Sequence, residues 1–136
     1  MEQRDYILRE IEKIGQMILG IMGKLQSKKQ TKEFHAGLNL ANQEFDEEIG
    51  MSLEMFAGMD PDSLDAFFKN HPELNSTNQE LLADLLIDIG EEISDEPIVY
   101  FRQALQILNR IDLDGKTFSM ERSGKIKYLS NKLHSN

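Results

Sequence analysis

Apolar residues recur at alternating steps of four and three over residues 5–26, which predicts one long amphipathic helix. The recurring positions are Ile7, Ile11, Ile14, Ile18, Ile21 and Leu25. Leu8, Leu19 and Met22 widen this apolar line, so we expect the helix to be buried on more than one side. The same helix contains Gly15, Gly20 and Gly23. Each glycine costs about 1 kcal/mol relative to alanine, and we expect close approach of a neighbouring backbone to offset that cost.

The same spacing predicts a second helix that begins near Phe34 and ends at Gly50. Residues 52–59 predict a short helical turn. Asp60 and Pro61 then provide an N-cap and a first helical residue.

Three further helices are predicted in the remaining chain. Ser76 or Thr77 is the expected N-cap of the first, with Glu80 completing a capping box with Thr77. This helix carries a wide apolar stripe, which predicts an internal position; the stripe comprises Leu81, Leu82, Leu85, Leu86, Ile89 and Ile93. Pro97 begins the next helix, and the last begins near Ser119.

No segment shows the apolar and polar alternation of a half-buried strand. We therefore predict an all-α fold of six or seven helices joined by short turns and packed as antiparallel hairpins. A chain of 136 residues has the length of a single domain. Within this domain, residues 5–59 supply the N-terminal helices and residues 60–136 the C-terminal ones.

One segment carries a family resemblance. In YFRQALQILNRID, residues 100–112, Phe101 is followed three and four residues later by Ala104 and Leu105. This resembles the second helix of a tetratricopeptide (TPR) repeat. Asn109 stands where that repeat often has proline. RDYILREIEKIGQMI, at residues 4–18, is similar to the first helix of small uncharacterised bacterial proteins with degenerate TPR-like helices.

The resemblance covers roughly half of the chain. It implies a TPR-like stack of helical hairpins, either a right-handed superhelix or an irregular bundle, and it implies no reaction.

The charge is strongly acidic and unevenly distributed. The net charge is −9, and Lys69 is the only lysine or arginine between Glu44 and Glu96. Nucleic acid and anionic lipid are therefore disfavoured as partners, because both bind through basic residues.

The most apolar stretch, residues 14–22, is far shorter than the roughly 20 residues that span a bilayer. Mixed charges near the N-terminus are unlike a signal peptide, so we expect no membrane association and a cytoplasmic location.

Residues 110–121, RIDLDGKTFSME, contain most of an EF-hand calcium loop, with aspartate at positions three and five, glycine at six and glutamate at twelve. The first position, which normally supplies an aspartate oxygen, is Arg110. We therefore interpret Asp112, Asp114 and Gly115 as the end of one helix, and Ser119 as the cap of the next.

Other candidate chemistry is sparse. His35, His71 and His134 are far apart in the sequence, and none belongs to a pair with metal-ligand spacing. Acidic pairs such as Asp84 and Asp88 can in principle hold a divalent ion or transfer protons. Periodicity places them opposite the apolar stripes, so we expect a solvated face. No cofactor is predicted.

The sequence thus favours a non-enzymatic protein–protein interaction module. The acidic middle suggests a protein or peptide partner with basic residues. Candidate contact residues are Glu47, Glu48, Asp84, Asp88 and Glu91. Alternatively, this acidity only keeps the protein soluble or faces its own basic C-terminal segment. The apolar line of the first helix, from Ile7 to Leu25, also offers a seam for homodimerisation. A rival class is a carboxylate-based metal-binding protein or enzyme within a helical bundle.

Overall fold

A computed structural model describes residues 2–115 and 117–134, and these residues form seven helices and no strand. The predicted all-α class is therefore confirmed. The helices are α1 (Glu2–Gln26), α2 (Phe34–Ile49), α3 (Leu53–Ala57), α4 (Pro61–Asn70), α5 (Ser76–Glu92), α6 (Pro97–Asp114) and α7 (Met120–His134).

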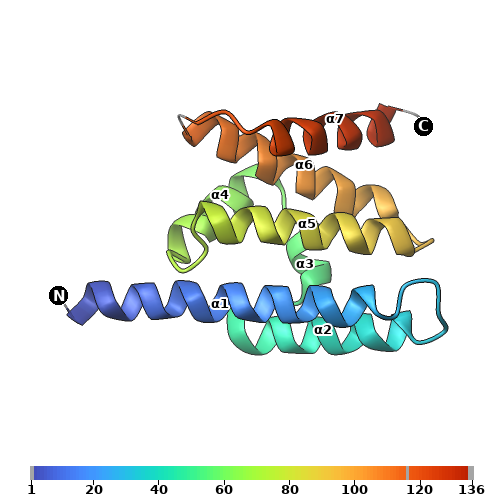
Figure 1. Cartoon of the computed structure of the whole chain (residues 1–136), viewed down its shortest axis with the longest axis horizontal. Helices are drawn as coiled ribbons and strands as arrows, with labels where there is room; N and C mark the ends of the chain where they lie inside the picture. The colour runs from blue at the N-terminus through green and yellow to red at the C-terminus, as the bar shows by residue number, and fades with distance from the viewer. Residues whose placement is uncertain (1, 116, 135–136) are drawn as a thin grey trace.

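The long helices alternate in direction along the chain. In Figure 1, α1, α5 and α7 run one way, and α2 and α6 run back. The pairs α1–α2 and α5–α6 are therefore antiparallel hairpins, while α3 and α4 bridge them. Helix α5 packs against both α6 and α1, and α7 packs against α6. This order places α5 inside the stack.

Local sequence signals account for several helix ends. Gly50 adopts a left-handed conformation with a φ of 101°, and its amide donates to the Asp46 carbonyl at 2.8 Å. Only glycine adopts this conformation without a steric cost. Asp60 accepts a hydrogen bond from the Ser63 amide at 3.3 Å, with Pro61 in the first turn of α4. Both predicted boundaries are confirmed.

The predicted N-cap of α5 is wrong by one or two residues. Asn75 caps this helix, because its side-chain oxygen accepts a hydrogen bond from the Asn78 amide at 3.0 Å. Ser76 and Thr77 lie inside the first turn. Glu80 forms no capping box; its carboxylate faces Arg122 and Lys125 of α7 instead.

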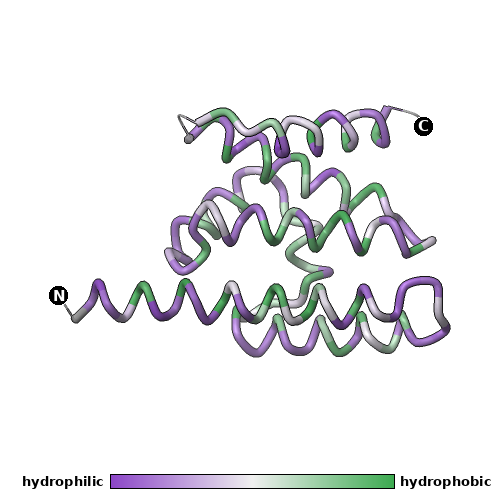
Figure 2. The backbone as a smooth tube through the Cα atoms, in the orientation of Figure 1, coloured by the Kyte–Doolittle hydropathy of each residue, from purple (hydrophilic) through white to green (hydrophobic). Residues whose placement is uncertain are grey.

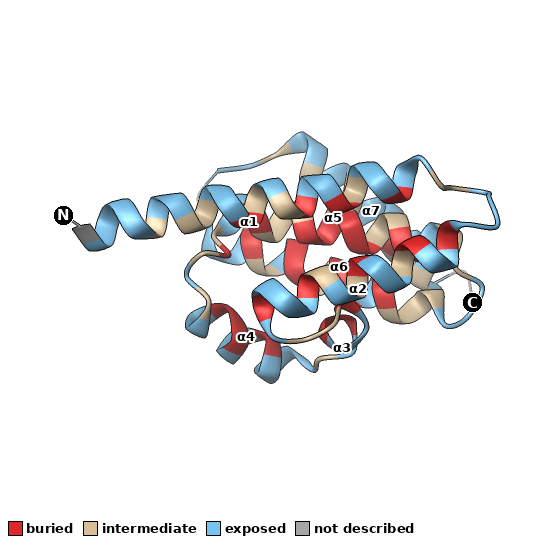
Figure 3. Cartoon of the chain, turned by 90° about the horizontal axis from the view of Figure 1, so that it is seen from below, coloured by how far each residue is buried: buried red, intermediate tan, exposed pale blue. Residues whose placement is uncertain are grey.

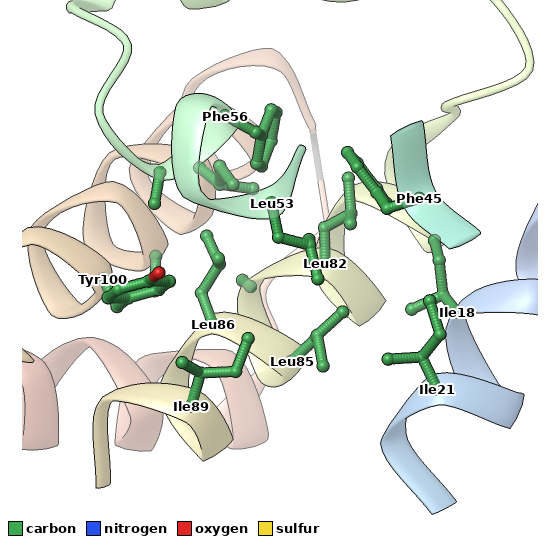
Figure 4. Close-up of a cluster of buried hydrophobic side chains, with 14 of the residues drawn as sticks. Ile18, Ile21, Phe45, Leu53, Phe56, Leu82, Leu85, Leu86, Ile89 and Tyr100 are labelled. Carbon is green, nitrogen blue, oxygen red and sulfur yellow. The ribbon is translucent and has the colours of Figure 1, made fainter. Parts of the chain in front are cut away.

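One continuous core connects the helices. It extends from Ile14 of α1 to Leu129 of α7, and Figure 4 shows its central part, where α5 meets α1, α2, α3 and α6. Figure 2 shows the hydrophilic and hydrophobic positions alternating along α1 and α2, as amphipathic helices require. The residues of α5 with less than one per cent exposure are Leu82, Ala83, Leu85, Leu86 and Ile89.

Helix α1 is buried on one side only. The seam from Ile14 to Leu25 is buried, but Leu8 and Leu19 are 55% and 47% exposed, and Met22 is half-buried. The predicted burial on several sides is therefore wrong. Figure 3 shows that the first turns of α1 project beyond the other helices, where no neighbour covers them.

Only some of the glycines mark close packing. A Cβ at Gly15 would lie 2.9 Å from the side-chain oxygen of Asn78, whose amide nitrogen donates to the Ile11 carbonyl. Nothing lies within 4 Å of such an atom at Gly20 or Gly23, so the expected close approach is absent there. At Gly90 it would lie 2.8 Å from the Phe101 ring. Gly90 therefore allows α6 to pack directly on the α5 backbone.

We expect Gly90→Ala to lower the free energy of unfolding by about 1–3 kcal/mol, because the added methyl group overpacks against the Phe101 ring. The control is Gly20→Ala, which meets no neighbour and should raise stability by up to about 1 kcal/mol through helix propensity. Urea unfolding of both variants measures the difference. Equal effects in the two variants would show that close packing at Gly90 is not limiting.

Candidate functional site

A groove of about 560 Å³ lies along the side of α5 that the core does not cover, between α1 and α7. Helix α1 contributes Met22 and Gln26, and α7 contributes Lys125 and Tyr128 together with Glu121 and Gly124. The floor comes from α5, whose other sides are covered by the core. The residues of α5 that line the groove are Asp84, Ile87, Asp88 and Glu91.

The three predicted acidic residues of α5 share this groove because they recur at steps of four and three on one helix. Asp84 and Asp88 do not lie on the solvated face that periodicity suggested, whereas Glu91 is an exposed residue. The Asp88 side chain is only 16% exposed, and that of Asp84 only 27%. The neighbouring helices α1 and α7 shield these carboxylates, which amphipathicity alone does not reveal.

Asp84 lies beside a cation from the other end of the sequence. Its carboxylate is 2.9 Å from the ammonium group of Lys125, which is also 3.3 Å from Glu80 and 3.5 Å from Glu121. Burial raises the pKa of Asp84, although Lys125 acts in the opposite direction. Burial by itself lowers the pKa of Lys125, but its hydrogen bonds and ion pairs with Asp84 and Glu80 outweigh this and raise it. The Asp84 carboxylate is thus incompletely compensated for its lost hydration.

Asp88 and Glu91 are tied to the turn between α1 and α2. The Lys29 ammonium lies 3.5 Å from Asp88 and 3.8 Å from Glu91, and Gln26 donates to Asp88 at 3.4 Å. From the opposite side, the Tyr128 hydroxyl donates to Glu91 at 2.6 Å. Burial, followed by this hydrogen bond and the Glu91 charge, raises the pKa of Tyr128 to about 12.

The two other acidic candidates lie elsewhere. Glu47 and Glu48 are exposed residues of α2 and do not line the groove. Glu48 forms an ion pair with Lys13 at 3.3 Å, and Glu47 borders a separate cleft between α1 and α2. The structure therefore divides the predicted acidic face into two parts on different helices.

In the EF-hand-like segment, the described residues form the end of α6 and the cap of α7, and Lys116 lies outside the described residues. Helix α6 continues through Asp114, and Gly115 forms its C-cap. Ser119 accepts a hydrogen bond from the Arg122 amide at 3.1 Å, as predicted for a cap. Arg110 lies 2.7 Å from Asp65, so it belongs to the contact between α6 and α4.

Arg122 is a junction between three helices. Its guanidinium donates to Asp112 of α6 at 2.7 Å and to Glu80 of α5 at 3.1 Å. Together with Lys125, it fixes α7 over α5 through ion pairs. In the described part of α7, Leu129 is the one fully buried residue, so charge contributes much of the contact between α7 and α5.

The histidines remain separate. His71 lies 3.2 Å from Glu73 and stacks on Phe67, and His134 contacts the Ser130 carbonyl. His35 is exposed on α2. Among residues 2–115 and 117–134, no three histidine, aspartate or glutamate side chains group as a metal site would require.

Sequence reasoning missed the residues that complete the groove, namely Met22, Ile87, Lys125 and Tyr128. The positive charge of the C-terminal segment was the available signal for Lys125. Nothing local indicated that Tyr128 lies beside Glu91.

Comparison of this sequence with protein-family models and with curated proteins, and of the structure with solved structures, found no match. No helix in the described part of the chain combines the length and apolarity needed to cross a membrane.

We expect Lys125→Met to raise the pKa of Asp84 further. The substitution removes the ammonium group whose hydrogen bond and charge lower this pKa, and it retains much of the side-chain volume. Carbon NMR titration of the Asp84 carboxyl measures this pKa. In both proteins the folded state binds this proton more tightly than the unfolded state. Stability should therefore decrease as the pH rises from the unfolded pKa through the folded pKa, and it should decrease more in the variant.

The control is Lys127→Met, an exposed position on the same helix that forms no ion pair with another described residue. It should leave the Asp84 titration unchanged. An Asp84 pKa that shifts equally in both variants would contradict the local pairing with Lys125.

Proposed function

We propose that this protein is a non-enzymatic, TPR-like interaction module that holds a basic peptide or helix in the groove above α5. The observation that carries this proposal is the lining of the groove. It contains four carboxylates, from Asp84, Asp88, Glu91 and Glu121, and one ammonium group, from Lys125. A negative surface of this kind favours a positively charged partner.

The arrangement of helices supports a TPR-like mode of binding. Stacked helical hairpins expose one helix of each pair on a shared surface, where extended partners bind. Helices α1, α5 and α7 run in the same direction and together line the groove, while α2 and α6 run back in the other direction.

The groove also offers apolar contacts. Met22 and Ile87 are half-buried and lie among the carboxylates. Methionine is flexible and adapts to irregular partner surfaces. We therefore infer a partner that combines lysine or arginine with apolar side chains, such as an amphipathic basic helix.

Two lysine side chains already pair with the groove carboxylates and oppose the binding of a further cation. Lys29 and Lys125 already neutralise part of the groove, so an incoming cation must share the carboxylates or displace these side chains. Because the groove is open to solvent, its electrostatic attraction is screened by salt. Binding should therefore weaken as ionic strength increases.

We expect the double variant Asp88→Asn/Glu91→Gln to bind a fluorescein-labelled amphipathic Leu/Lys helix at least about tenfold more weakly than the wild type, because charge-assisted contacts are lost. Fluorescence anisotropy at low and moderate salt measures the affinity. Thermal unfolding followed by circular dichroism verifies that the variant is folded.

The matched control is Glu47→Gln/Glu48→Gln, which removes the same charge from α2 outside the groove. It should retain wild-type affinity, and a Leu/Glu peptide should not bind the wild type. If the two double variants lose affinity equally, net charge rather than the groove attracts the peptide, and the proposal fails.

A second copy of the chain is the alternative partner. Tyr6 and Leu8 are 57% and 55% exposed on the turns of α1 that project beyond the other helices (Figure 3). The remainder of the predicted seam, from Ile14 to Leu25, is buried in the protein's own core. Size-exclusion chromatography with light scattering decides between the two, since a monomer at micromolar concentration excludes a stable dimer.

A further inference from the structure

A pocket of about 300 Å³ lies between α6 and the turn that connects α3 to α4. It shares no lining residue with the acidic groove. Met59 and Pro61 contribute apolar surface from the side of the turn, and Val99 does so from α6. Gln103 and Gln106, one helical turn apart on α6, also line it. The pocket therefore combines apolar walls with two carboxamide groups.

Gln103 is the buried polar residue of this pocket, with an exposure of only 1%. Its side-chain nitrogen donates to the Phe56 carbonyl at 2.8 Å and to the Met59 carbonyl at 3.1 Å. These two hydrogen bonds fix the orientation of the carboxamide, because turning it over would place its oxygen against two carbonyl oxygens. The Oε1 oxygen of Gln103 is therefore an acceptor in a fixed position.

This oxygen has no hydrogen-bond partner. It is buried and accepts no hydrogen bond from any described residue, and the same holds for Oε1 of Gln106. Buried polar atoms are normally paired, and a buried acceptor without a donor destabilises a protein. Only three buried side-chain atoms lack a partner in the described ranges, and two of them belong to the glutamines of this pocket. The unpaired oxygens point to a ligand that carries N–H donors.

Gln106 is able to adapt to such a ligand. The residue is half-buried, and its side chain forms no hydrogen bond with a described residue. A carboxamide that turns over exchanges the positions of its donor and its acceptor, so Gln106 can present either one. Because nothing holds this side chain by a hydrogen bond, a ligand can move it aside and reach the more deeply buried Gln103.

The charges of the lining favour a neutral ligand. The lining contains one cation, Arg102, and one anion, Asp60. The Asp60 carboxylate already accepts hydrogen bonds from the amide and the hydroxyl of Ser63. Arg102 is exposed and forms no ion pair with a described residue, so its guanidinium can donate to a ligand. The guanidinium would repel a cation, and an anion would meet the unpaired glutamine oxygens.

We propose that this pocket binds a neutral primary carboxamide. The N–H group of the ligand supplies the donor that the Gln103 oxygen lacks, and the ligand oxygen accepts a hydrogen bond from Gln106 or Arg102. Met59 and Val99 cover the apolar part of the ligand. The same chemical group is offered by a small free amide and by an asparagine or glutamine side chain of a partner protein.

The test is a ¹H–¹⁵N NMR titration of the full chain with two primary carboxamides, propionamide and Nα-acetyl-glutamine methylamide. Their controls are N,N-dimethylpropionamide and Nα-acetyl-alanine methylamide, which lack the primary carboxamide. At least one primary carboxamide should produce saturable shifts at residues 57–61 and 99–106 and at the side-chain amide of Gln103, and the controls should not.

The two primary carboxamides distinguish the source of the ligand. Saturation by the glutamine derivative alone assigns the pocket to a partner's side chain, whereas saturation by propionamide shows that a small free amide suffices. The proposal is overturned if neither compound saturates, or if either control acts equally.

Substitutions make the assignment specific. Arg102→Met/Gln106→Met removes both donors to the ligand oxygen and should weaken binding at least about fivefold. This variant loses no hydrogen bond or ion pair between described residues, so thermal unfolding should resemble that of the wild type. Lys127→Met/Asn109→Leu removes one positive charge and one carboxamide outside the pocket, and it should bind as the wild type does. Equal affinity in these two double variants would overturn the proposal.

Discussion

Helix α5 is enclosed by its neighbours, and the direct contact between Gly90 and the Phe101 ring fixes its closest one, α6. Because α1 covers a further side, the apolar residues of α5 face the core almost completely. Its carboxylates are then confined to the remaining strip, which faces the space between α1 and α7. The enclosed position of one helix thus determines both the core and the location of the acidic groove.

The same constraint explains why α7 is attached differently from the other long helices. The strip of α5 that remains for α7 is acidic, so a helix that covers it must supply cations. Arg122 and Lys125 do so, while Leu129 and the half-buried Ile126 anchor the helix on the core. The alternative that the acidity faces the protein's own basic segment therefore describes part of the groove. At the other end of the groove, Asp88 instead pairs with Lys29, and Glu91 accepts a hydrogen bond from the Tyr128 hydroxyl.

Much of the fold follows from local sequence, and most of the site does not. The end of α2 and the start of α4 were predictable, because Gly50 can adopt the left-handed conformation that ends a helix and Pro61 has its φ fixed at a helical value. The cap of α5 was not, because Asn75 adjoins serine and threonine, which serve the same purpose equally well. The exposure of Leu8 depends on how far neighbouring helices extend, and the spacing of residues within α1 carries no such information.

The spacing of Asp84, Asp88 and Glu91 placed them on one strip of a helix, which the structure retains. Their partners are Lys29, Lys125 and Tyr128, which lie far away in the sequence. Sites assembled from separate helices are visible only after the packing is known.

Hydrogen exchange of the native protein at low and high salt tests most directly whether α5 is the enclosed centre and whether ion pairs help to hold α7 in place. The amides of α5 should exchange slowest, through global unfolding, at either salt concentration. The amides of α7 should exchange through a smaller opening that becomes easier as salt screens the ion pairs of Arg122 and Lys125. Faster exchange in α5 than in α7, or exchange in α7 that does not respond to salt, would contradict this arrangement.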